Sequence, residues 1–124
     1  MSAQYSSYRS ALAIAALAAV TSYAGAQQYP ERPIRLLIPS PPGGGTDLLG
    51  RIVKDGFIER WGQPVVVDNR GGASGRIAAA AAAKAPPDGY TLFFTYGGVL
   101  TTGQPLFGNL PYDPIADFAP VAMM

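Results

Sequence analysis

Two glycine-rich segments hold residue types that could bind a small anion. The first is PPGGGTD, residues 41–47, and the second is NRGGASG, residues 69–75. A glycine-rich turn ahead of a helix points several backbone N–H groups outward, and the helix dipole adds partial positive charge at the same place. A carboxylate or a phosphate fits such a site. The alternative is that the glycines only make tight turns, and the occurrence of two such loops favours anion binding over it.

Asp47 is the acidic residue of the first segment, and two roles are open for it. In the first turn of a helix its carboxylate would complement the macrodipole and pair with Arg51 one turn later. The spacing favours this structural role. Alternatively, Asp47 would contact an ammonium or hydroxyl group of a ligand, or order a bridging water.

The composition argues against an enzyme. The sequence contains no His and no Cys, so it lacks the usual general base at neutral pH, a thiol nucleophile and the ligands that zinc prefers. We therefore expect no catalytic residues, no metal and no cofactor. A nucleotide-binding domain is an alternative, because Asp68 stands where a dinucleotide fold places its ribose carboxylate. The glycine fingerprint of that fold fails, since its third glycine would fall at Leu48, and no GxxxxGK[ST] motif occurs.

Apolar and turn-forming residues alternate around these loops and predict the elements that position them. The expected order is strand Ile34–Ile38, a helix from Thr46 to a stop at Gly62, strand Val65–Val67, helix Arg76–Ala85 and strand Tyr90–Thr95. In the first helix, Leu49, Ile52, Val53 and Phe57 recur at helical spacing and are expected to face the core.

Strand, glycine loop and helix in alternation predict an α/β fold with a parallel sheet and right-handed crossovers. The loops after the three strands, including a third at residues 96–98, would then lie on one edge of the sheet. That edge is where ligands bind in open α/β folds.

The first 26 residues have the features of a signal peptide. Arg9 precedes the apolar run Ala11–Val20, and Ala24, Gly25 and Ala26 form an A-x-A cleavage site. We expect export to the periplasm and a mature chain that starts at Gln27. Without Arg9 the acidic and basic side chains balance, which gives no support for binding to nucleic acid or anionic lipid.

Five segments, in the same order, resemble the opening of the Bug family of tripartite tricarboxylate transporter receptors. They are residues 29–53 (YPERPIRLLIPSPPGGGTDLLGRIV), 62–70 (GQPVVVDNR), 71–75 (GGASG), 84–92 (KAPPDGYTL) and 110–121 (LPYDPIADFAPV). Each segment alone is a weak signal, but the five in register cover nearly all of the mature chain.

The resemblance implies a periplasmic solute-binding receptor that closes two lobes on a small carboxylate and delivers it to a membrane permease. It also implies the first-lobe portion of a type II periplasmic binding protein fold, with a partial doubly wound parallel sheet. The residues implied to bind the carboxylate are Gly43, Gly44, Gly45, Thr46, Asp47, Asn69, Ser74, Gly75, Thr95 and Tyr96.

Family members continue through a second lobe, so residues 27–124 are expected to form the amino-terminal part of one lobe. A chain of this length would bind its ligand only weakly by itself, because one lobe supplies half of the enclosure. The alternative is a small exported α/β remnant without a transport role.

Overall fold

The chain is described by a computed structural model that covers residues 29–123. The expected signal peptide, residues 1–26, and the expected mature start at Gln27 lie outside the described residues. Among residues 29–123, no helix combines the length and the apolar character that crossing a membrane requires.

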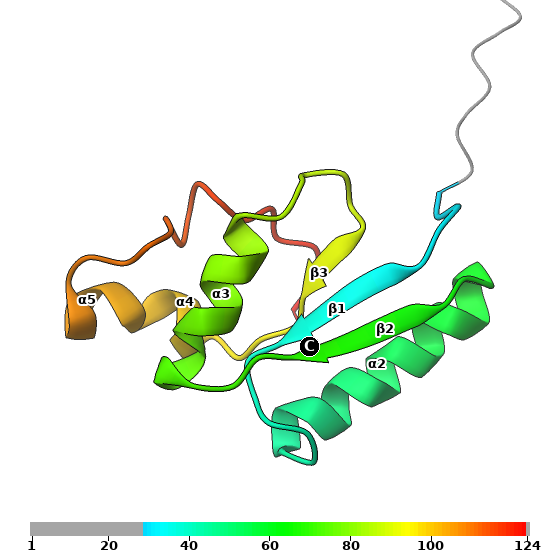
Figure 1. Ribbon diagram of the computed structural model, residues 1–124, viewed down its shortest axis with the longest axis horizontal. Coiled ribbons are helices and arrows are strands. Elements are labelled where there is room, and N and C mark those ends of the chain that lie inside the picture. The colour runs from blue at the N-terminus through cyan, green and yellow to red at the C-terminus, as the bar shows by residue number, and fades with distance from the viewer. Residues whose placement is uncertain (1–28, 124) are drawn as a thin grey trace, which may run out of the picture.

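A three-stranded parallel sheet forms the centre of the fold (Figure 1). Its strands are β1 (Ile34–Ile38), β2 (Val65–Asn69) and β3 (Thr91–Phe93), in the spatial order β2-β1-β3. Both neighbours pair with β1 in parallel, so that Leu36 lies opposite Val67 on one side and Leu92 on the other. The predicted α/β class and parallel sheet are confirmed.

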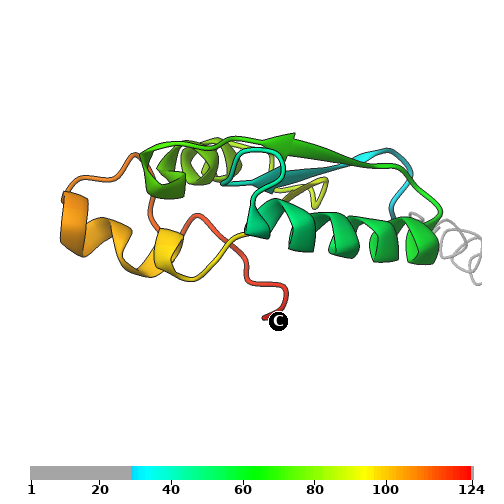
Figure 2. The ribbon, with the colours of Figure 1, turned by 90° about the horizontal axis from the view of Figure 1, so that it is seen from below.

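Two helices cover the two faces of this sheet, α2 (Gly45–Trp61) and α3 (Arg76–Ala83). The other helical elements are the 3-10 turn η2 (Ala73–Gly75), α4 (Gly98–Thr101) and α5 (Gly103–Phe107). The long helix α2 packs below β1 and β2, and α3 contacts β1 and β3 from the other face (Figure 2). This is the partial doubly wound arrangement that the family resemblance implies.

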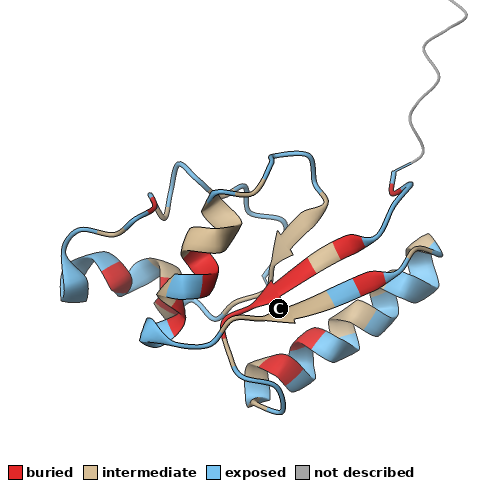
Figure 3. Cartoon of the chain, viewed as in Figure 1, coloured by how far each residue is buried: buried red, intermediate tan, exposed pale blue. Residues whose placement is uncertain are grey.

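Burial is greatest in β1, because it is the central strand (Figure 3). Ile34, Leu36 and Ile38 are 0–2% exposed and point to the face covered by α2, where Phe57 and Trp61 pack against them. On the opposite face, a second cluster joins Ala79 of α3, Val99 of α4 and Tyr112, with Phe93 of β3 packed against it.

The stripe of α2 that faces the sheet differs from the predicted one. Leu49 and Ile52 are 56% and 68% exposed, whereas Gly50 is buried. A Cβ atom at Gly50 would collide with the Ile38 side chain and lie 3.2 Å from Cδ1 of Phe94. The prediction was wrong for Leu49 and Ile52, because apolar spacing sets the period of a helix while close packing at Gly50 sets its rotation.

The ends of the elements also shift by one or two residues. Helix α2 begins at Gly45 rather than Thr46, β2 runs to Asn69 rather than Val67, α3 ends at Ala83 rather than Ala85, and β3 is Thr91–Phe93 rather than Tyr90–Thr95. The extension of β2 follows from pairing, since Asn69 lies opposite Ile38 in the ladder. Gly62 ends α2 as predicted, and its N–H donates to the Ile58 carbonyl at 2.9 Å.

Candidate functional site

Three loops leave the carboxyl ends of the three strands and gather at one edge of the sheet (Figure 1). Loop one is residues 39–44, loop two is residues 70–75 and loop three is residues 94–97. We call the surface that they form the loop edge. The connections from β1 and β2 lead to opposite faces of the sheet, and ligands of open α/β folds bind where such connections diverge.

Loop one is a tight turn that delivers the chain into α2. The N–H of Gly44 donates to the Pro41 carbonyl at 3.2 Å, and Gly43 has a φ of +82°. Helix α2 then begins at Gly45. The N–H groups in the first turn of a helix have no partner within the helix, and the dipole adds positive character there. This end of α2 therefore favours an anion.

The carboxylate of Asp47 lies buried beneath loop one, with 1% of the residue exposed. Its Oδ2 accepts hydrogen bonds from Nε of Arg51 at 2.9 Å and from the N–H of Gly43 at 2.8 Å, and its Oδ1 accepts one from Nδ2 of Asn69 at 2.9 Å. The bond from Arg51, followed by those from Gly43 and Asn69, lowers the pKa of Asp47 to about 2. The predicted pair with Arg51 is confirmed, and Asp47 is ionised at neutral pH.

Loop two has a strained backbone. Four successive residues have positive φ angles, namely +110° at Gly72, +47° at Ala73, +55° at Ser74 and +86° at Gly75. This conformation costs a residue with a side chain on the order of 1–2 kcal/mol, so contacts with the rest of the protein must hold Ala73 and Ser74 in it. Nε of Arg76 donates to the Ala73 carbonyl at 3.0 Å, and its guanidinium lies 3.8 Å from the ring centroid of Phe107. Backbone of this kind is concentrated at functional sites.

Loops one and two touch each other directly. Nδ2 of Asn69, at the end of β2, donates to the Ser40 carbonyl at 3.1 Å as well as to Asp47. A Cβ atom at Gly71 would lie 3.2 Å from both the nitrogen and Cδ of Pro41. The hydroxyl of Ser40 is buried and has no hydrogen-bond partner among the described residues.

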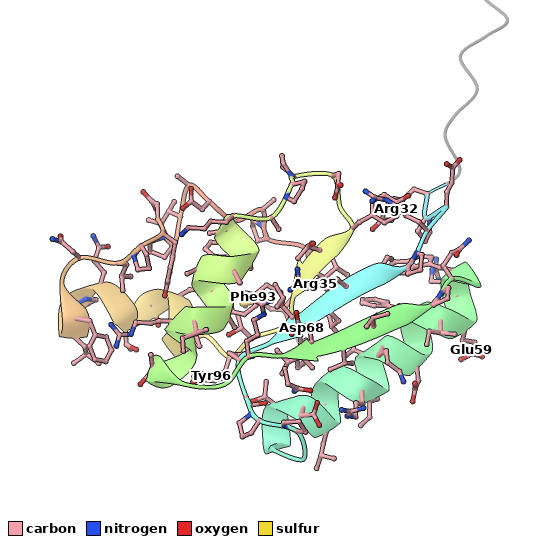
Figure 4. All side chains as sticks on the ribbon, in the orientation of Figure 1. Arg32, Arg35, Glu59, Asp68, Phe93 and Tyr96 are labelled. Atoms are coloured by element: carbon pink, nitrogen blue, oxygen red, sulfur yellow. The ribbon has the colours of Figure 1, made fainter. Side chains whose placement is uncertain are left out.

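Loop three is packed against loops one and two through α4, the helix that follows it. Val99 of α4 is 2% exposed, and a Cβ atom at Gly75 would lie 2.7 Å from its Cγ2 and 3.1 Å from Cβ of Pro39. The hydroxyl of Thr95 donates to the Tyr96 carbonyl at 3.2 Å, and Tyr96 is 47% exposed. Tyr96 lies near the carboxyl ends of the strands (Figure 4), so loop three presents an aromatic side chain there.

Asp68 forms an ion cluster on the sheet face that α2 does not cover. Arg35 and Asp68 point toward each other (Figure 4), with Nε of Arg35 2.8 Å from Oδ2, and Nε of Arg70 lies 3.2 Å from the same oxygen. These contacts, that of Arg35 above all, lower the pKa of Asp68. Asp68 thus orders the start of loop two, as expected for a polar residue at a strand end. A concavity of about 590 Å³ runs beside it, along β1 and β2, and reaches Pro42 and Asn69.

All ten predicted binding residues lie at the loop edge or directly beside it. Six of them form the hydrogen-bonded cluster around Asp47 or adjoin it along the chain, namely Gly43, Gly44, Gly45, Thr46, Asp47 and Asn69. Ser74 and Gly75 lie in the strained turn of loop two, and Thr95 and Tyr96 lie in loop three. Sequence reasoning missed Gly50 and Val99, which fix the distances between the elements. An isolated glycine inside a helical pattern was the available signal for Gly50. Among residues 29–123, no group of His, Cys, Asp or Glu side chains could hold a metal ion.

The lowered pKa of Asp47 predicts how stability depends on acidity. Because its folded-state pKa is about 2 and its ordinary value is 3.8, this group stabilises the fold above about pH 4 and loses that effect as the pH falls toward 2. Asn cannot titrate, so Asp47→Asn should be less stable than the natural chain at pH 7, and the difference should shrink between pH 4 and 2. Urea unfolding of both proteins, followed by circular dichroism, measures this. A difference that stays constant over this range contradicts the assignment.

Comparison with known sequences relates this chain to a family of transport receptors. Residues 49–124 match the pattern of the Tripartite tricarboxylate transporter family receptor. Protein BugT of Bordetella pertussis is 41% identical over 110 residues, which are 88% of this chain and 34% of BugT. The chain thus spans about a third of the length of the curated relatives it matches.

Solved structures share the same architecture. The periplasmic binding protein BugD superposes with a TM-score of 0.69 at 38% identity, over 73% of this chain and 30% of BugD. MatC from Rhodopseudomonas palustris, with bound malate, gives 0.70 at 36% identity, over 75% of this chain and 32% of MatC. An R. palustris protein with adipate gives 0.66 at 41% identity, over 69% of this chain and 29% of that protein. The predicted fold class, a portion of a periplasmic binding protein, is confirmed.

Proposed function

We infer that this chain, which belongs to the tripartite tricarboxylate transporter receptor family, carries part of the binding site for a small dicarboxylate at its loop edge. The observation that carries the proposal is that two solved relatives of similar fold hold malate and adipate, both of which are dicarboxylates. Receptors of this family bind solutes and are not enzymes.

Binding would rest mainly on backbone groups. The amides of Gly45 and Thr46 lie at the amino end of α2, where N–H groups lack helical partners and the dipole attracts a carboxylate. The nearby negative charge of Asp47 would oppose this attraction if it were exposed. The Arg51 cation balances this charge and two further hydrogen bonds hold the carboxylate beneath loop one, so a ligand carboxylate can approach this end of the helix.

Loops two and three would complete the enclosure on this side of the ligand. Ser74 is exposed in the strained turn, and Tyr96 is exposed in loop three. Both can donate a hydroxyl hydrogen bond, and Tyr96 adds an apolar surface for the carbon chain of the ligand. The second carboxylate of the ligand would need contacts that one lobe does not supply.

The cellular role that we propose is uptake. The expected signal peptide, residues 1–26, supports export to the periplasm, where the receptor would capture a dicarboxylate and deliver it to the membrane permease of a tripartite transporter. Backbone amides in a preformed turn suit rapid capture and release, because little has to be reordered when the ligand arrives.

Titration of the ¹⁵N-labelled chain with malate and adipate tests the proposal by nuclear magnetic resonance. We expect amide shifts at residues 43–47 and 69–75 with a Kd near the millimolar range, since each solvent-exposed hydrogen bond contributes only about 1 kcal/mol. Gly45→Leu should weaken binding roughly tenfold or more, because its side chain would cover the amides at the start of α2.

The matched control is Gly56→Leu on the same helix, where an added Cβ also meets nothing within 4 Å. This variant should leave the Kd unchanged, because position 56 lies far along α2 from loop one. Equal affinity in both variants would show that the start of α2 does not bind the ligand. The absence of any shift at residues 43–47 and 69–75 would reject the proposed function itself.

A further inference from the structure

We propose that Asp47 is a positioning residue, whose buried carboxylate clamps loop one to the end of β2 and so fixes the loop edge in its binding geometry. This inference rests on the proposed function and assigns Asp47 and Asn69 to holding the loops together rather than to touching the ligand.

The clamp holds loop one at two points. Toward the end of the loop, the N–H of Gly43 donates to Oδ2 of Asp47 at 2.8 Å. Near its beginning, the carbonyl of Ser40 accepts from Nδ2 of Asn69 at 3.1 Å, and the same Nδ2 donates to Oδ1 of Asp47 at 2.9 Å. Asp47 and Asn69 therefore link loop one and the first turn of α2 to the end of β2, which lies 22 residues further along the chain.

The surroundings of Asp47 leave little room for a ligand contact. Only 1% of the residue is exposed, and both carboxylate oxygens already accept hydrogen bonds from groups of the protein. A ligand ammonium or hydroxyl group could reach the remaining acceptor site on Oδ1 only if the atoms that cover the carboxylate moved aside. The arrangement favours a fixed internal acceptor over an exchangeable one.

Arg51 has a different part in this cluster. Its Nε donates to Oδ2 at 2.9 Å from the same helix, and its side chain is 46% exposed. It thus balances the charge of Asp47 without linking one loop to another. The links that position loop one run through Gly43 and Asn69.

Asp47→Asn breaks the clamp with a minimal change in shape. The new amide nitrogen must face either Nδ2 of Asn69 or the N–H of Gly43 and Nε of Arg51, and in each case two donors oppose each other. Asp55→Asn is the matched control, because it makes the same chemical change on the same helix at a side chain that is 72% exposed.

If only the charge of Asp47 mattered, Asp47→Asn would bind malate more tightly, whereas loss of the clamp predicts weaker binding. Both substitutions remove one negative charge from α2, which by Coulomb attraction favours binding of a dianion. Weaker binding in Asp47→Asn therefore reports lost geometry. We expect its Kd for malate to rise roughly tenfold, the loss that follows when one or two hydrogen bonds are misaligned. Asp55→Asn should stay within about twofold of the natural chain.

Hydrogen exchange supplies a readout that does not depend on the ligand. In Asp47→Asn, exchange of the Gly43 amide should accelerate by about tenfold or more beyond any change at the amides of β1, because β1 reports the fall in global stability and Gly43 reports an additional local opening. Asn69→Ala removes the side chain that joins Asp47 to the Ser40 carbonyl. It should likewise raise the Kd for malate and accelerate exchange of the Gly43 amide, and it replaces Asp47→Asn in the experiment if that variant does not fold.

The outcomes separate the inference from the function on which it rests. If the natural chain binds neither malate nor adipate, the proposed function fails, while exchange at Gly43 still tests the clamp. If malate binds the natural chain and Asp47→Asn equally well, the positioning role is wrong. The role is also wrong if protection at Gly43 falls no further than protection in β1, because the substitution then lowers global stability without opening loop one locally.

Discussion

Replacement of Gly50 by valine should destabilise the chain by about 3 kcal/mol or more, a large share of the total stability of a small domain. Gly50 faces the sheet in the middle of α2, where an added Cβ atom would strike the Ile38 side chain and lie 3.2 Å from Cδ1 of Phe94. Both neighbours belong to the face of the sheet that α2 covers, and Ile38 is fully buried. The helix would have to move away from β1, and the contacts of Phe57 and Trp61 would loosen with it.

Gly56→Val isolates this packing effect. Position 56 lies on the same helix, and a Cβ atom there meets nothing within 4 Å. Both variants change glycine to the same β-branched residue in a helix, so they share the change in helix propensity, which is below about 1 kcal/mol. Urea unfolding should show a large loss for Gly50→Val and almost none for Gly56→Val. Similar midpoints for the two variants would mean that α2 does not rest on the sheet at Gly50.

Gly75→Ala should cost roughly 3 kcal/mol, because two separate penalties add at this residue. Its φ of +86° disfavours any residue with a side chain by on the order of 1–2 kcal/mol. An added Cβ would also lie 2.7 Å from Cγ2 of Val99, where overpacking costs a further 1–3 kcal/mol or so. Since the added Cβ would press on Val99 of α4 and also lie 3.1 Å from Cβ of Pro39 in loop one, the damage should reach all three loops.

Gly62→Ala provides the comparison for the backbone penalty alone. Gly62 has a left-handed conformation similar to that of Gly75, with φ and ψ of 65° and 9°, and a Cβ atom there meets nothing within 4 Å. Thermal unfolding should therefore show a smaller loss for Gly62→Ala than for Gly75→Ala. Equal losses of stability would mean that an added Cβ at position 75 is not crowded by Val99. The conclusion that loop two packs tightly against α4 at Gly75 would then be wrong.

The sequence was sufficient for the order and type of the main elements. The run Ile34–Ile38 between prolines, the stop at Gly62 and the alternation of strands with glycine loops all depend on neighbours in the chain, and local sterics and hydrogen bonding act on them directly. The family resemblance was confirmed for the same reason, since it was carried by short motifs in a fixed order. Parallel pairing then placed the loops on one edge without any further information.

The tertiary structure alone decided how those elements meet. Leu49 and Ile52 have the spacing of a buried stripe, yet the close approach at Gly50 turns them outward, because the rotation of a helix depends on the surface against which it packs. Asp47 was correctly paired with Arg51, four residues away, but its bond to Asn69 spans 22 residues and carries no local signal. The contact of Gly75 with Val99 is likewise invisible until β1, β2 and β3 are assembled. Local interactions therefore determined which segments could bind an anion, and contacts between distant residues determined which of their side chains are available to do so.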